Sequence, residues 1–136
     1  MKVKIEIKKS CIYIQLRGEF IPDDKRHLAE SKRIVLKAFN EAKKNQIFKL
    51  LFDARTVSTD LSIINRYQLM MSLATVYINY ILKYHIRPLK TAITLNKALI
   101  DPQKFDEIVA RNRGMNMLIT HDLEEALKWL AVEPYQ

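Results

Sequence analysis

The residues that could carry out chemistry are few and far apart in this sequence. Three histidines, His27, His85 and His121, show neither the paired-histidine nor the cysteine–histidine spacing that a zinc site requires. Cys11 is the single cysteine, and its place in a predicted hairpin is typical of a small strand residue rather than a nucleophile. We therefore expect no metal site and no catalytic cysteine.

The glycine pattern argues against nucleotide binding. The chain has two glycines, Gly18 and Gly114, whereas phosphate-binding fingerprints need several closely spaced glycines. A Gly-x-Ser-x-Gly nucleophile elbow does not occur, and no set of acid, base and nucleophile stands out. We expect a non-enzymatic protein that needs no cofactor.

Polar side chains gather where the predicted parallel strands end, which is where such sheets bind ligands and partners. The candidate binding residues are Asp53, Arg55, Asp60, Ser62, Arg66 and Asn96. Free N–H groups at a helix start could help this rim to bind a small anion. In the alternative interpretation Asp60 is a helix cap, and the others are ordinary loop residues.

These residues must be positioned by an alternation of strands and helices. Residues 2–8 and 12–17 alternate apolar and polar side chains with period two, which predicts an antiparallel hairpin that ends at Gly18. Further strands are predicted over 48–53, 91–95 and 115–119. Residues 54–60 are predicted to be a polar connection.

Helices are predicted between these strands and after the last one. They run from Pro22 to about Asn45, from Leu61 to about Tyr84, from Asp101-Pro102 to Gly114, and onward from Thr120 or Asp122. We expect Asp60 to cap the second helix and Gly114 to have the positive φ of a helix end.

The predicted fold class is α/β, with a β-hairpin followed by β-α units. The five strands form a mixed sheet with helices packed on it, the first two strands antiparallel and the last three parallel. A length of 136 residues fits a single domain over residues 1–136.

The second predicted helix is unusual because it has no formal charge between Arg66 and Lys83. Apolar residues cover most of its circumference, but interruptions such as Gln68 and Asn79 exclude a membrane span. Such a helix is normally buried on more than one side. We therefore expect a homodimer or a ligand-filled groove on the face opposite the sheet, with Tyr77 pointing outward.

The net charge of +8 is concentrated at the start of the chain. Residues 1–50 carry +7, residues 51–100 carry +4 and residues 101–136 carry −3. A basic half is compatible with nucleic-acid or anionic-membrane binding, but interleaved acids favour a solvated lysine-rich surface, so no specific nucleic-acid binding is expected. One cysteine and an opening without a leader pattern predict a cytoplasmic protein.

Several segments taken together resemble the STAS domain, the fold of anti-sigma-factor antagonists, and especially its SpoIIAA-like branch. They are Leu51-Phe52-Asp53-Ala54-Arg55, Asp60-Leu61-Ser62, Arg66-Tyr67, Asp101-Pro102-Gln103-Lys104-Phe105, 109–114 and 123–130. The resemblance implies a STAS-like fold. In phosphoswitch members a kinase phosphorylates a serine that follows an aspartate, and Ser62 stands at that place with Leu61 before it.

Two main hypotheses of function follow. The first is a non-catalytic regulatory module that binds a protein partner, or itself, through the second helix and adjoining loops. The alternative is a carrier of a small apolar molecule or lipid in a pocket beside that helix. A weaker third hypothesis is an anionic-surface binder that uses the basic first helix. A cavity beneath the second helix would favour the carrier, and a flat apolar patch would favour the interaction module.

Overall fold

The computed structural model describes residues 1–8 and 10–131 as alternating strands and helices. In chain order they are β1 (Lys2–Lys8), β2 (Cys11–Phe20), α1 (Lys25–Asn45), β3 (Lys49–Thr59), α2 (Ile63–Tyr84), β4 (Lys90–Leu95), the 3₁₀ turn η1 (Lys97–Leu99), α3 (Phe105–Asn112), β5 (Asn116–Thr120) and α4 (Leu123–Leu130). The predicted order of strands and helices is confirmed, with η1 as an addition.

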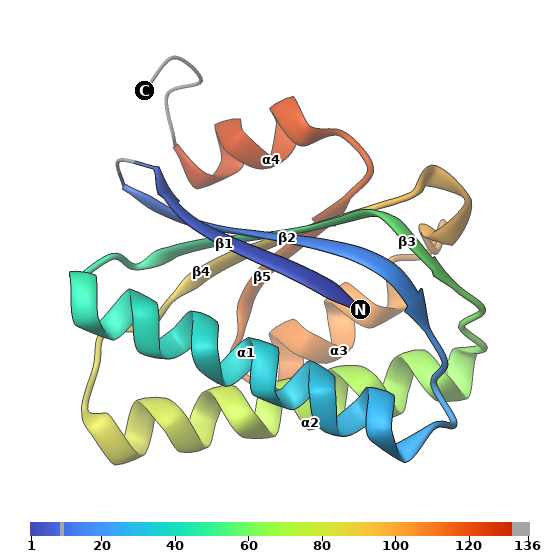
Figure 1. The fold of residues 1–136 in the computed structure, drawn as a ribbon, viewed down its shortest axis with the longest axis horizontal. Helices are drawn as coiled ribbons and strands as arrows, with labels where there is room; N and C mark the ends of the chain where they lie inside the picture. Colours follow the sequence, from blue (N-terminus) through green and yellow to red (C-terminus); the bar gives the residue numbers. More distant parts are fainter. Residues whose placement is uncertain (9, 132–136) are drawn as a thin grey trace.

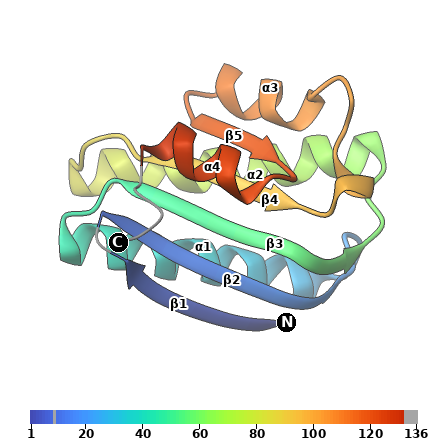
Figure 2. The same cartoon turned by 90° about the horizontal axis from the view of Figure 1, so that it is seen from above.

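The strands form one sheet in the order β1-β2-β3-β4-β5. β1 is antiparallel to β2, and the pairs β2–β3, β3–β4 and β4–β5 are parallel. This confirms the predicted five-stranded mixed sheet and the parallel arrangement of its last three strands. Helices α1, α2 and α3 cover one face of the sheet, and α4 lies on the other (Figures 1 and 2).

The second strand extends further than the sequence predicted. Gly18 does not end it, because β2 continues to Phe20 and pairs there with the last residues of β3. Gly18 has a φ of +119°, and a Cβ on it would lie 3.3 Å from the Cα of Met1. Glycine is therefore needed here to let the strand pass close to the chain start.

The third strand is also longer than expected, so the prediction of a polar connection over 54–60 is wrong for residues 54–59. Gln15 lies opposite Asp53 and Arg17 lies opposite Thr56, so β3 contributes one residue more than β2 between these pairs. Such a β-bulge bends the strand and redirects its side chains. The lengthened strand carries the chain to the start of α2.

Helix ends follow the predicted signals at Asp122 and Gly114, and Asp24 is a further cap. Asp24 caps α1 by accepting a hydrogen bond from the N–H of Arg26, and Asp122 caps α4 by accepting from Glu124 and Glu125. Gly114 follows α3 with the predicted positive φ, +95°. The prediction for Gly114 is confirmed.

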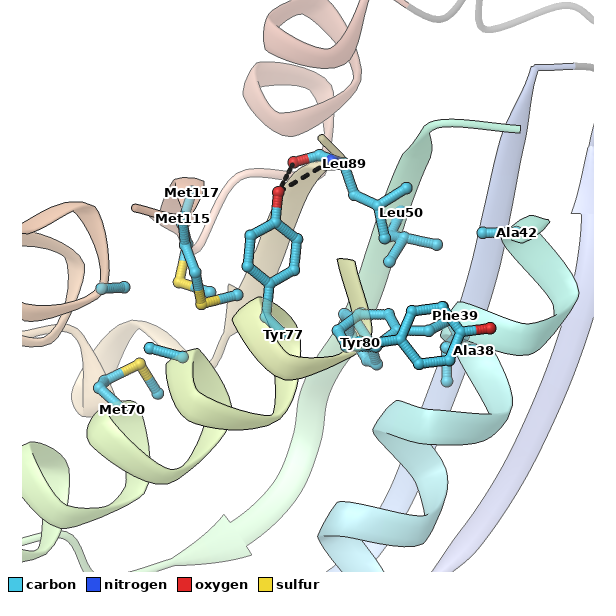
Figure 3. Packing of buried hydrophobic residues seen from close by; sticks show 14 of the residues in the cluster. Ala38, Phe39, Ala42, Leu50, Met70, Tyr77, Tyr80, Leu89, Met115 and Met117 are labelled. Carbon is cyan, nitrogen blue, oxygen red and sulfur yellow. Dashed lines mark hydrogen bonds between the residues drawn. The ribbon is translucent and has the colours of Figure 1, made fainter. Parts of the chain in front are cut away.

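The hydrophobic core is divided unequally between the two faces of the sheet. The larger part lies between the sheet and helices α1, α2 and α3, and Figure 3 shows Phe39, Tyr77 and Met117 within it. The smaller part lies under α4 around Leu51, Ala92 and Leu130. Among the described residues, no helix is both long enough and apolar enough to cross a membrane.

Candidate functional site

Asp53 is the best-connected polar residue of the predicted rim. It lies in β3 on the α4 face of the sheet and is 4% exposed. Its carboxylate accepts two hydrogen bonds from the Arg55 guanidinium, both at 2.9 Å, one from the Thr94 hydroxyl at 2.9 Å and one from the Tyr13 hydroxyl at 3.1 Å. Asp53 and Arg55 are thus brought together, and they are bonded to each other.

The charge states of this cluster follow from its contacts. Burial opposes ionisation of Asp53, but hydrogen bonds from Arg55 and Thr94 outweigh it and hold the pKa of Asp53 below its ordinary value. Burial, followed by the charge of Asp53, raises the pKa of Tyr13 to about 12. Tyr13 therefore remains a neutral donor, and the carboxylate remains charged, at physiological pH.

A polar hollow lies beside the Asp53 cluster, on the part of the sheet next to α4. Gln15, Arg17, Asp53, Arg55 and Thr56 line it. Its volume, about 450 Å³, is larger than that of the apolar cavity described below. However, the five residues form a shallow lining that is open to solvent. This is a feature of the open surface rather than an enclosed site.

Ser62 is the N-cap of α2, and Asp60 is not. The Ser62 side chain accepts from the N–H of Asn65 at 3.1 Å, while the Asn65 side chain accepts from the N–H of Ser62 at 3.4 Å. This reciprocal arrangement is a capping box. The prediction that Asp60 caps the helix is therefore wrong, and Asp60 lies exposed in the preceding loop.

Arg66 is buried in an ion pair rather than presented to a partner. Its guanidinium donates to the Asp106 carboxylate of α3 at 3.0 Å and to the carbonyl of Leu99 at 2.7 Å. The two side chains are 11% and 6% exposed. The pair fixes the start of α2 against α3 and η1, which is a structural task.

The remaining rim residue, Asn96, caps η1 by accepting a hydrogen bond from the N–H of Ala98 at 2.9 Å. The six rim residues therefore do not converge on one centre. Asp53 and Arg55 belong to the α4 face, whereas Arg66 packs on the three-helix face. Sequence reasoning missed Tyr13 and Thr94, the partners of Asp53, because they come from two other strands.

Tyr77 does not face outward, so the prediction that it forms a partner-binding surface is wrong. It is 1% exposed, and its ring packs edge-on against Phe39 with a centroid distance of 5.9 Å. Its hydroxyl accepts from the N–H of Leu89 at 3.0 Å and donates to the carbonyl of that residue at 3.4 Å (Figure 3). Burial raises its pKa.

The outer face of α2 is less apolar than the sequence suggested. The sheet, α1 and α3 surround much of the helix (Figures 1 and 2), so the fold itself covers more than one side. The exposed middle of the helix carries Gln68, Thr75 and Asn79. Large exposed apolar side chains remain at its start, where Ile63 is 70% and Ile64 is 68% exposed.

An apolar cavity of about 160 Å³ lies between the sheet and helices α1 and α2. Its walls come from four strands and three helices, and include Phe39, Phe52, Leu69, Met70, Ile93 and Met117. It is open to solvent on one side, and Ile93 and Leu95 are only partly buried although they belong to an inner strand. The sequence suggested a pocket beside this helix but not which residues form it.

The polar side chains that line the cavity are mostly satisfied. Ser31 donates to the carbonyl of Leu28 at 2.8 Å, and Arg66 and Asp106 bind each other. The hydroxyls of Thr59 and Thr91 are buried and have no hydrogen-bond partner among the described residues. The wall of the cavity therefore has no net charge, and its two unpaired hydroxyls are buried.

The residues considered for catalysis lie apart from these features. Cys11 is 2% exposed, and burial raises the pKa of its thiol to about 11. It is therefore a protonated core residue at physiological pH. Within the described part of the chain, no three histidine, cysteine, aspartate or glutamate residues are grouped so that they could hold a metal ion.

Of the comparisons with known proteins, the one with solved structures gives a match. No protein-family model matches the sequence, and no curated protein matches it. Among solved structures, the chain is similar to the anti-sigma-factor antagonist SpoIIAA in its unphosphorylated form, with 12% sequence identity and a TM-score of 0.49. The match covers 96% of this chain and 98% of the other.

Proposed function

We propose that this chain is a non-enzymatic binding domain that holds a small apolar molecule between α1, α2 and the sheet. The observation that carries the proposal is the cavity of about 160 Å³. The cavity is open to solvent, so its apolar wall is exposed to water. An apolar molecule that filled it would remove this surface from water, which is favourable.

The size and lining of the cavity define what fits. An engineered cavity of about 150 Å³ lined by aliphatic and aromatic side chains stays dry and binds benzene. The present cavity has a similar volume and a mainly apolar wall. Its one charged pair, Arg66 with Asp106, is internally neutralised. A charged ligand would have to lose its hydration without gaining a counter-charge, so the occupant is uncharged.

The experiment is a titration of the protein with toluene, followed by NMR of the methionine methyl groups. Met70, Met115 and Met117 line the cavity, so their signals should shift on binding. The variant Ile93→Phe places a larger ring in the cavity and should weaken toluene binding about tenfold or more. Ile108→Phe is the matched control, because Ile108 is 50% exposed on α3.

Two results would contradict the proposal. One is the absence of methionine shifts in the wild-type protein at concentrations near the solubility of toluene. The other is equal binding by wild type and Ile93→Phe, since that would place toluene outside the cavity.

A second candidate function is association with a protein partner, or with another copy of the chain, through the start of α2. The observation that favours it is the exposure of Ile63, Ile64 and Tyr67 on adjacent turns beside the cavity residues Leu61 and Arg66. Exposed apolar groups that lie together often mark association sites. If this surface forms a homodimer, sedimentation should show it at micromolar concentration, and Ile64→Ser should weaken it. The phosphorylation of Ser62 stays a prediction.

A further inference from the structure

We infer that the polar hollow on the α4 face of the sheet is a binding site for a phosphate group, which the side chains of Arg17 and Arg55 hold between them. The hollow lies on the opposite face of the sheet from the apolar cavity, so this inference does not depend on the proposed function. Within the described chain, α4 lies over β4 and β5 and leaves much of β1, β2 and β3 uncovered (Figure 2). A ligand can therefore reach the hollow from solvent.

The β-bulge between β2 and β3 directs two consecutive residues of β3 to the hollow. Arg55 and Thr56 both line it. Consecutive side chains of a regular strand point to opposite faces of the sheet. The extra residue that the bulge places in β3 allows these two to share one face. Gln15 and Arg17 reach the same hollow from β2, so two guanidinium groups, an amide and a hydroxyl surround it.

Arg55 is held in place by Asp53, and part of its guanidinium group stays available. The Asp53 carboxylate accepts hydrogen bonds from Nε and Nη2, each at 2.9 Å, and Nη1 donates no hydrogen bond within the described chain. The side chain of Arg55 is 41% exposed, whereas that of Asp53 is 5% exposed. An anion in the hollow would therefore meet the free edge of a fixed guanidinium group, while the negative charge of Asp53 is buried and already paired.

Arg17 brings an unpaired positive charge to the hollow, and a second cation lies opposite it. Lys2 of β1 is the register partner of Arg17, so the two side chains leave the sheet on the same face. Neither forms an ion pair within the described chain, because Glu6 of β1 pairs with Lys4 and Lys8 instead. Like charges directly opposite each other destabilise a sheet. A bound anion would offset this repulsion.

The groups around the hollow suit a phosphate group better than a carboxylate. A phosphate group carries up to two negative charges near neutral pH and three strong acceptor oxygens, which match Arg17, Arg55 and the side-chain amide of Gln15. A carboxylate has one charge and two oxygens, so it would leave a donor unused. Because the hollow is open to solvent, water and salt screen its charges, and we expect weak, salt-sensitive binding.

The test follows the backbone amide signals of β2 and β3 by NMR while sodium phosphate or glycerol phosphate is added at constant ionic strength. Both should shift the amides of Arg17 and Thr56. Arg17→Gln should weaken phosphate binding about fivefold or more, because it removes a charge-assisted hydrogen bond at an exposed position. Tighter binding of glycerol phosphate would identify a phosphate ester as the ligand, and equal binding would mean that the phosphate group alone is recognised.

The matched control is Arg33→Gln, which removes the same charge from an exposed position on α1 and should leave phosphate binding unchanged. A second control replaces phosphate with sodium chloride at the same ionic strength. The inference is wrong if chloride causes the same shifts, or if Arg17→Gln and Arg33→Gln bind phosphate equally, since either result would mean a general attraction of anions to a basic protein. It is also wrong if neither phosphate compound shifts these signals. Each of these results leaves the proposal for the apolar cavity unaffected.

Discussion

Two buried polar side chains on opposite faces of the sheet, Asp53 and Thr91, differ in their hydrogen bonding. On the α4 face, Asp53 is buried and every contact that it needs comes from Arg55, Thr94 and Tyr13. On the three-helix face, Thr91 is buried as deeply and has no partner among the described residues, next to a cavity. Hydrogen-bonded polar groups stabilise a fold, whereas a buried polar group without a partner lowers its stability.

A hydrogen-bonded and an unpaired buried hydroxyl also occur on one strand, β4. Thr91 and Thr94 both belong to β4 and are 2% and 0% exposed. Because side chains alternate between faces along a strand, an odd separation sends them to opposite sides. Residue type and burial alone therefore do not distinguish a hydrogen-bonded threonine from an unpaired one; the groups that surround its hydroxyl do.

The largest expected effect tests whether the three-helix face is loosely packed everywhere. Tyr77→Asp should destabilise the protein by about 4 kcal/mol or more, because it buries a charge in place of a ring that packs on Phe39 and binds Leu89. Thr75→Asp is the control, since Thr75 is exposed on the same helix. Urea unfolding followed by circular dichroism measures both, and a stable Tyr77→Asp protein would show that the loose packing reaches beyond the cavity.

The sequence predicted those features that depend on neighbouring residues. Alternation and helical spacing gave the strands and helices in order, and local chemistry gave Gly114 as a positive-φ residue and Asp122 as a cap. The periodicity of apolar residues and the helix caps involve residues that are only a few positions apart, so both can be recognised directly in the sequence. The capping serine of α2 was missed because two acceptors, Asp60 and Ser62, stand close together there.

Features that depend on distant residues could not be predicted. The bond from Tyr13 to Asp53 spans 40 positions and exists because of the register of β2 and β3. Tyr77 was wrongly assigned to the outer face because a helix that is apolar nearly all round does not reveal which side meets the core. The orphan hydroxyl of Thr91 likewise follows from packing, since β4 is covered on both faces.

The second prediction concerns Asp53 on the α4 face of the sheet. Asp53→Asn should cost about 2–3 kcal/mol, because the charge-assisted bonds to Arg55 and Thr94 are weakened. The side chain of Arg55 is 41% exposed, and solvent screening therefore limits its share. Asp60→Asn, at an exposed loop position, is the control and should be nearly neutral.

The pH dependence of the folding stability should also reflect the contacts of Asp53. The pKa of Asp53 is lower in the folded protein than its ordinary value, which is about 4 in an unfolded chain. The unfolded state therefore binds the proton first as the pH falls, so the contribution of Asp53 is complete above about pH 4 and is lost as the pH falls through the folded pKa. Urea midpoints between pH 6 and pH 3 should fall more steeply in wild type than in Asp53→Asn; parallel curves would assign acid sensitivity elsewhere.

The smallest expected effect is the most direct test of the comparison between the two faces. Thr94→Val should destabilise the protein by about 1–2 kcal/mol, because Asp53 loses a hydrogen-bond donor. Thr91→Val should instead stabilise it by about 0.5–1 kcal/mol, because it removes a buried hydroxyl that has no partner in the described structure. Both substitutions keep side-chain volume and β-branching, so packing and strand propensity cancel between them. Urea unfolding without ligand should therefore give shifts of opposite sign. Loss of stability in both variants would mean that the Thr91 hydroxyl is already satisfied, and the difference between the two threonines would then be wrong.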